Sequence, residues 1–439
     1  MWSGGAPIRH TPERPFPVST TIAPSRAPFL PTLGAVGASF VVTGFLGRLP
    51  MATLQLAMLV YASDRLGSFG LGGLLVAALG LGGAAGGLVV GPACDRWGQR
   101  RTGLTAIAVQ AGALAGLLLV AMPPSPPLVP MVVLAALTGA ANPQVGSMAR
   151  SRWASWARRR QQRHQLVSTA MAYEAAADET SFVVGPLVVS LLMLQVDPSA
   201  AMALIGAALV IAQGAFVLHP SARSRVDSTT DPGAESVGAS TASLGSGAPG
   251  LPVRAGGVGR LVLPMAVGAA GVGVVFGAVQ TGLAAHFDSL GTPAVSGTVY
   301  ACLGIGSAVA GLLTTRIPAT VPLSTRMAAS GLALAAASLL LLGSSTPLLL
   351  AAACTAVGLA VAPVLVSAYA LAERVSPESA LTTAMTLLAV ATVVGVSAGA
   401  ALGGWLAEAH APGAAFAVAS AAGTVAATSG WASRRPERR

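Results

Sequence analysis

Long apolar segments separated by short polar segments run along almost the whole chain. A helix needs about 20 mainly apolar residues to cross the hydrocarbon core of a bilayer, and these segments reach that length. Twelve can be placed, at about 30–61, 68–90, 102–121, 127–149, 165–192, 199–218, 258–285, 292–315, 324–343, 346–371, 379–406 and 411–431. The pattern predicts an all-α polytopic membrane protein with twelve transmembrane helices in two six-helix halves.

The polar segments divide the chain into two halves, a linker and two tails. Residues 1–29 are rich in Pro, Ser and Thr and are predicted to form a disordered cytoplasmic tail without a cleaved secretory signal. The predicted halves are residues 30–218 and 258–431. The Ser-, Gly- and Pro-rich stretch 219–257 between them is typical of a flexible cytoplasmic linker. Residues 432–439 form a short cytoplasmic tail.

The distribution of arginine predicts the orientation in the membrane. All 25 basic residues are Arg, and with the N-terminus inside, 23 of the 25 fall in cytoplasmic segments. Arg65 falls on the outer side, and Arg48 falls within the first apolar segment. Because cytoplasmic loops carry an excess of basic residues, this count favours twelve spans with both termini cytoplasmic in a bacterial plasma membrane.

The composition excludes several classes of protein. Charged residues make up 9% of the chain, against about 25% in average soluble proteins. The chain has no Lys, which excludes a Walker A nucleotide-binding loop and a Schiff-base lysine. Orientation accounts for the net charge of +10, so no nucleic acid or nucleotide partner is expected. The three cysteines are too scattered for a disulfide framework or a metal site, and no cofactor is expected.

The polar loop between the second and third apolar segments carries an unusual set of residues. It combines one acid and three arginines with bounding glycines: Gly91, Asp95, Arg96, Gly98, Arg100 and Arg101. This spacing resembles the loop after helix 2 in the major facilitator superfamily, whose pattern is similar to Gly-x-x-x-Asp-Arg-x-Gly-Arg-Arg. The resemblance implies two parallel six-helix halves that transport a solute by alternating access. It also implies that Asp95 and the arginines form a conformational latch on the cytoplasmic side, whereas a merely positive-inside loop would explain only the arginines.

Glycines recur at every fourth position in two of the predicted helices. The sequence-predicted ridges are Gly83 and Gly87 in helix 2, and Gly395, Gly399 and Gly403 in helix 11. Such spacing makes a flat face that another helix can approach closely. Helices 2 and 11 face each other in the family that this chain resembles, so a contact between the two ridges is expected. Ordinary glycine-rich packing is the alternative.

Charges inside the apolar segments indicate a mechanism. The fifth segment carries Glu174, Asp178 and Glu179, and Asp178 is expected about 20 Å along its helix, near the middle of the bilayer. A charge there costs at least about 2.5–3.5 kcal/mol, so these acids should face a cation, a proton or water rather than lipid. Arg48 lies at a similar depth, and we expect it to pair with Asp178 or Glu179. The pair could be purely structural, but three acids against one Arg leave a carboxylate free to carry a proton.

Gly185 and Pro186 follow on the same segment and predict a helix kink, because Pro removes a backbone hydrogen bond. The pair resembles the helix 5 signature of the antiporter branch of the facilitators. Together with the acids, it favours proton-coupled efflux of a small organic solute. Uptake or uniport of a metabolite is the alternative. A membrane-embedded sensor or enzyme is a further alternative, but the sequence offers no converging catalytic set, so no enzyme is expected.

Overall fold

The computed structural model describes residues 37–158, 163–223, 255–314, 316–318, 320–376 and 381–434. Within these ranges the chain forms helices and no strands. The predicted tail 1–29, residues 435–439 of the predicted tail 432–439, and most of the predicted linker lie outside the described residues.

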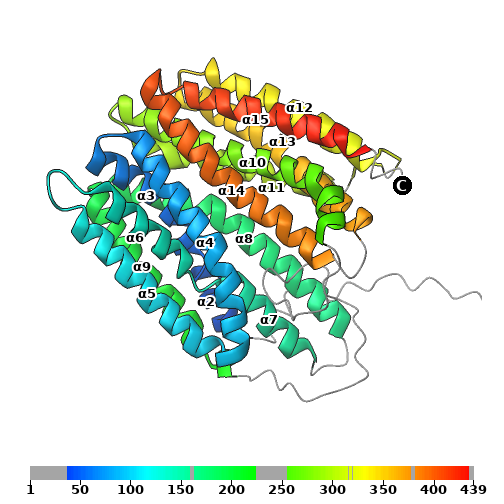
Figure 1. The fold of residues 1–439 in the computed structure, drawn as a ribbon, viewed down its shortest axis with the longest axis horizontal. Helices are drawn as coiled ribbons and strands as arrows, with labels where there is room; N and C mark the ends of the chain where they lie inside the picture. Colours follow the sequence, from blue (N-terminus) through cyan, green and yellow to red (C-terminus); the bar gives the residue numbers. More distant parts are fainter. Residues whose placement is uncertain are drawn as a thin grey trace, which may run out of the picture.

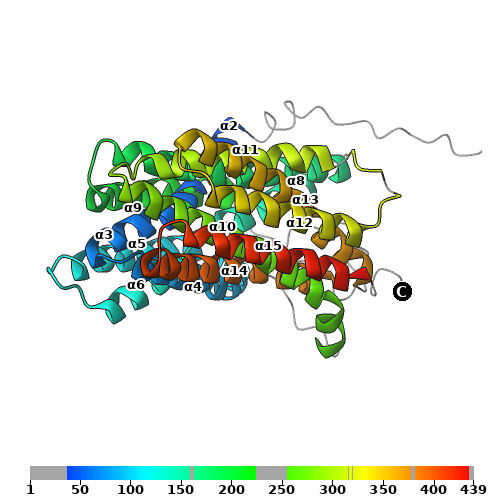
Figure 2. The ribbon, with the colours of Figure 1, turned by 90° about the horizontal axis from the view of Figure 1, so that it is seen from above.

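The described helices form two groups, which we call the first half and the second half (Figure 1). The first half contains α2 (Ala38–Leu46), α3 (Leu49–Leu66), α4 (Phe69–Trp97), α5 (Gln99–Val120), α6 (Leu128–Ala140), α7 (Val145–Arg158), α8 (Arg163–Met193), α9 (Pro198–Leu218) and the 3-10 helix η1 (Pro220–Arg223). The second half contains α10 (Ala255–Ser289), α11 (Val295–Thr314), α12 (Leu323–Leu342), α13 (Pro347–Val375), α14 (Leu381–Ala409) and α15 (Ala414–Ala432). Figure 2 shows that most helices run along one common direction.

Among the described residues, 11 helical segments are long and apolar enough to cross a membrane. Two of them comprise two helices each, namely α2 with α3 (Ala38–Leu66) and α6 with α7 (Leu128–Trp153). Helix α15 is not among the 11, but its 19 residues pack along α10 and α12 and complete the second half. The fold class predicted from the sequence is confirmed.

The first and fourth spans are broken, whereas the apolar pattern predicted continuous helices. Pro50 in the first turn of α3 has no N–H to donate, and its ring clashes with a continuous preceding turn, so α2 ends before Gly47. Pro143 interrupts the fourth span in the same way, and Gln144 after it adopts a left-handed φ of 55°. That conformation is uncommon for a residue other than glycine and ends any continuity between α6 and α7.

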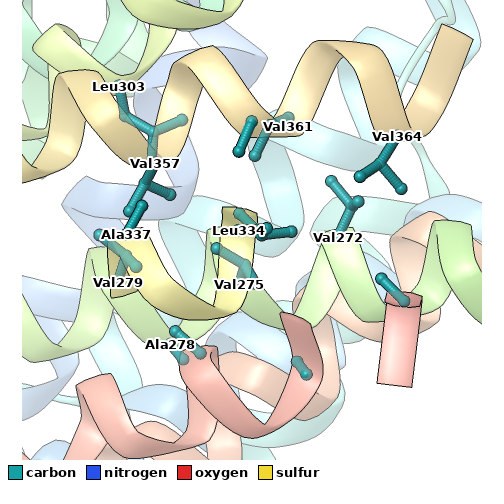
Figure 3. Close-up of a cluster of buried hydrophobic side chains, with 14 of the residues drawn as sticks. Val272, Val275, Ala278, Val279, Leu303, Leu334, Ala337, Val357, Val361 and Val364 are labelled. Atoms are coloured by element: carbon teal, nitrogen blue, oxygen red, sulfur yellow. The ribbon is translucent and has the colours of Figure 1, made fainter. Parts of the chain in front are cut away.

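Each half has its own apolar core. In the second half, Val272, Val275 and Val279 of α10 meet Leu334 of α12 and Val361 of α13 (Figure 3). These side chains are fully buried. Burial against other helices, rather than against lipid, is what fixes the relative positions of α10, α12 and α13.

The two halves meet mainly along α4 and α14. A methyl carbon placed on Gly73 would lie 2.3 Å from the carbonyl oxygen of Ala400, and one on Gly80 would lie 2.7 Å from Ser397 Oγ. In Figure 1 the two helices lie together where α4 begins and α14 ends, and they separate toward the other end of the bundle. We call the end where α4 begins the opposite face, and the end where α4 and η1 finish the linker face.

A second contact between the halves also depends on glycines that let two helices approach closely. The C-terminal part of α8 meets α11. A methyl carbon on Gly297 of α11 would lie 2.2 Å from Pro186 O, and one on Gly304 would lie 2.4 Å from Val183 Cγ2. Gly297 lies in the first turn of α11 and Pro186 lies near the end of α8, both toward the opposite face, whereas Gly304 lies at the middle of α11. The halves are therefore in backbone contact near the opposite face.

Candidate functional site

Four charged side chains meet where α3, α7 and α8 come together, and we call them the charge cluster. Arg48 Nη2 donates to Glu174 Oε2, and Arg48 Nε lies 2.8 Å from Asp178 Oδ1. Arg150 Nη2 donates to the second oxygen of Asp178. Trp153 Nε1 supports the cluster by donating to Glu174 Oε1 over 2.7 Å. The contact of Arg48 Nε with Asp178 is ionic, because its angle does not make a directed hydrogen bond.

The two helix breaks place these groups beside one another. Arg48 is the N-cap residue of α3 and donates Nη1 to a carbonyl oxygen of α2 over 2.9 Å. Glu174 and Asp178 are four residues apart on α8 and share a face of that helix. Gly146 in the first turn of α7 leaves room for the cluster, since a methyl carbon there would lie 3.4–3.5 Å from the neighbouring charged side chains.

The members of the charge cluster differ in how exposed their side chains are. The side chains of Glu174 and Arg48 are 1% and 6% exposed, whereas those of Asp178 and Arg150 are 32% and 20% exposed. Burial of a charge is costly unless it is paired, and the buried members are paired with each other. Asp178 is therefore the more exposed acid of the charge cluster.

The sequence predicted part of this arrangement. Arg48 lies beside Asp178, one of its two expected partners, but it also binds Glu174, which the sequence reading did not pair with it. Arg150 joins the cluster as a second guanidinium group, so that Glu174 and Asp178 face two arginines. The expected excess of acid also counts Glu179, whose side chain lies outside the described residues, and it stays a prediction. In the sequence, Arg150 directly follows the predicted fourth span, 127–149, and counts among the cytoplasmic arginines. The Asn142–Pro143 pair was the available signal that this helix breaks.

Three further predicted residues lie on α8. The backbone of Glu179 is part of the helix, but its side chain lies outside the described residues. Pro186 is inside α8, and a methyl carbon on Gly185 would lie 2.8 Å from the Ala52 backbone. Gly185 therefore lets α8 approach α3 closely, at a point that follows the charge cluster along both helices. The predicted kink itself stays a prediction.

The predicted latch loop forms the turn between α4 and α5 at the linker face. Gly98 ends α4 and precedes α5 with a φ of 84°, a conformation that favours glycine. Asp95, Arg96 and Arg101 are exposed, and Arg100 is half-buried. None of the three ion pairs within the described chain involves Asp95. Residues 377–380, which precede α14, lie outside the described residues, so the latch stays a prediction.

The predicted contact between the two glycine ridges is wrong. A methyl carbon on Gly395 or Gly399 would lie 2.1–2.2 Å from carbonyl oxygens of α10, and Gly403 also faces α10. Gly83 and Gly87 face α6 and Gln144 instead of α14. The ridge of α14 thus packs within the second half, because its close approach to α10 needs a face without side chains. The interface between the halves uses Gly73, Gly80 and Gly404, which the four-residue spacing did not identify.

Comparison with known proteins gives a consistent result. The sequence profile of the Major Facilitator Superfamily matches residues 36–328. No curated protein sequence matches the chain. Among solved structures, the nucleoside transporter NupG superposes with a TM-score of 0.67 at 15% identity, covering 90% of this chain and 98% of that one. A POT family peptide transporter, described as auto inhibited, gives a TM-score of 0.61 at 14% identity, covering 91% and 96%.

A D-xylose–proton symporter is also similar, with a TM-score of 0.59 at 13% identity and coverage of 90% of this chain and 97% of that chain. At these identities the three structures show the fold alone. The family profile spans well over half of the chain and includes both the loop with Asp95 and the charge cluster. The chain therefore belongs to the major facilitator superfamily and is a membrane transporter rather than an enzyme.

Proposed function

We propose that this transporter moves a small organic solute across a bacterial plasma membrane by alternating access, coupled to protons and in the direction of efflux. The observation that carries the proposal is the charge cluster, because four ionisable groups beside two helix breaks inside a membrane protein are typical of a functional site. Three of its residues are Arg48, Glu174 and Asp178, which were expected from the sequence to have this role.

The proton-coupling step would take place at Asp178. When its carboxylate is ionised, it neutralises Arg150 and part of Arg48. A proton on Asp178 would weaken both contacts and leave Arg150 free to reorient or to bind a polar group of the solute. Solute and proton would then compete for, or share, one group, which is the requirement for coupling their movements.

The contact pattern of the halves supports the alternating-access part. With the arginine-rich linker face in the cytoplasm, we infer that the contacts near the opposite face belong to the inward-facing state of the proposed cycle. The proposed latch would form in the other state, when the end of α4 that carries Asp95 approaches the beginning of α14. An acid is stabilised near a helix N-terminus by about 0.3–1 kcal/mol.

Uptake is the second candidate for the direction of transport. The similar structures include a nucleoside transporter and a D-xylose–proton symporter, both of which act on small polar solutes. An imposed proton gradient separates the two directions. Solute accumulation in cells driven by inward protons would favour uptake, and solute exclusion would favour efflux.

A growth-inhibition panel in an efflux-deficient bacterial host tests the proposal. We expect wild type to protect against one class of compounds and Asp178→Asn to lose at least about tenfold of that protection at equal expression, since the titrating group is gone. Glu373→Gln is the matched control, because Glu373 is an exposed acid at the linker end of α13. Full protection by Asp178→Asn would contradict proton coupling there, and no protection by wild type would contradict efflux.

A further inference from the structure

A carboxylate of the second half binds the first half at the opposite face. Glu408, in the last turn of α14, accepts hydrogen bonds from Ser68 Oγ and, over 3.0 Å, from the backbone N–H of Gly70. Ser68 is the N-cap residue of α4, and its Oγ accepts from Leu71 N over 3.1 Å. Glu408 therefore occupies the N-terminus of a helix that belongs to the other half.

This position favours an anion for a clear physical reason. The first N–H groups of a helix have no acceptor within the helix, and the helix dipole places partial positive charge there. Glu408 supplies both a negative charge and an acceptor to these groups. Within the described chain Glu408 belongs to no ion pair, so the helix terminus and Ser68 are its observed partners.

The packing beside Glu408 makes the contact sensitive to the separation of the halves. A methyl carbon on Gly404 would lie 2.3 Å from the Phe69 carbonyl oxygen, and one on Gly70 would lie 3.0 Å from Glu408 Oε2. The backbones of α4 and α14 are thus in direct contact one turn before Glu408. Opening the opposite face must separate these backbones and break both hydrogen bonds.

We infer that Glu408 is a gating residue of the transport cycle, whose contact with the N-terminus of α4 stabilises the state in which the opposite face is closed. The inference rests on the proposed alternating access. It assigns to α14 a role that complements the one proposed for Asp95. Each helix of this antiparallel pair would carry, at its own C-terminal end, the acid that holds one face shut.

Distance measurements between spin labels test the role of Glu408. Cysteines replace Met122 and Leu348, which are exposed on the opposite face of the first and second half, in a chain whose Cys94, Cys302 and Cys354 are replaced. Pulsed EPR in lipid nanodiscs then gives the populations of the closed and open opposite face. We expect Glu408→Gln to raise the ratio of open to closed about two- to fivefold, the stabilisation typical of an acid at a helix N-terminus.

Three further variants distinguish gating from a general structural role. Glu408→Asp should restore part of the closed population, and Glu373→Gln, the same charge change elsewhere in the second half, should leave it unchanged. Ser68→Ala should open the face, but Ser68→Ala combined with Glu408→Gln should add little to Glu408→Gln alone, because both act on one contact. Unchanged populations in Glu408→Gln, or equal shifts in Glu373→Gln, would overturn the inference. If wild type shows a single distance, the proposed alternating access fails instead.

Discussion

Arg48 is the residue whose surroundings constrain the mechanism most. It is buried at a helix break and touches two carboxylates, one fully buried and one partly exposed. The buried contact with Glu174 holds Arg48 in place, and the contact with Asp178 joins it to the carboxylate proposed to carry the proton. One side chain thus joins the structural and the proposed functional part of the charge cluster.

Neutral substitutions of Arg48 and Glu174 distinguish the contribution of this pair to stability from its contribution to transport. Arg48→Leu alone should destabilise the protein by about 3–5 kcal/mol, because it leaves Glu174 as an unpaired buried charge. Adding Glu174→Gln should recover most of that stability, since the amide oxygen still accepts from Trp153, but transport should remain lost. Thermal unfolding in detergent and transport by the same variants check this. Active transport in the stable double variant would show that the Arg48–Glu174 pair is only structural.

Single residues also show how far the sequence could lead. An Arg and acids inside apolar segments are costly, so their proximity was predictable from their positions within those segments. The participation of Arg150 was not, because its position depends on the break at Pro143, which separates α7 from α6. Glu408 was missed for another reason. An acid at the outer end of a span looks solvated in the sequence, and only the fold brings the N-terminus of α4 to it.

At the scale of elements, glycines determine how closely two helices can approach each other. Hydropathy predicted the spans and their approximate bounds, since each span must be long and apolar, but not the breaks within the first and fourth spans. It could not predict their partners, because glycine spacing shows that a helix has a flat face but not which neighbour covers it. For this reason the ridge on α14 was assigned to α4, whereas it packs on α10.

Neighbouring glycines on α4 give a test of this packing. A methyl carbon on Gly86 would lie 1.9 Å from the carbonyl oxygen of Ala140, so Gly86→Ala should force α4 away from α6 and cost at least about 1–3 kcal/mol. Gly87→Ala should be tolerated, because the nearest atom is a flexible amide of Gln144 at 3.6 Å. The melting temperatures of the two variants test whether α4 packs this closely on α6. Equal melting temperatures would contradict the α4–α6 contact described above.

At the scale of the whole molecule, the two halves and their one-sided contact define the proposed cycle. Contacts of α4 with α14 and of α8 with α11 lie toward the opposite face, and Glu408 adds hydrogen bonds between the halves there. The loop with Asp95 lies at the other end of α4, exposed at the linker face. A rocking motion of the halves would exchange one set of contacts for the other, and protonation of Asp178 is proposed to shift that balance.

The most direct test measures both faces of the wild-type protein. One pair of spin labels, at Met122 and Leu348, spans the opposite face, and a second pair, at Leu104 and Leu313, spans the linker face; all four positions are exposed. Populations are measured in nanodiscs over a series of pH values. We expect the two faces to open and close reciprocally with pH, and Asp178→Asn to remove that dependence. A single distance at each face, or two faces that open together, would contradict alternating access in this protein.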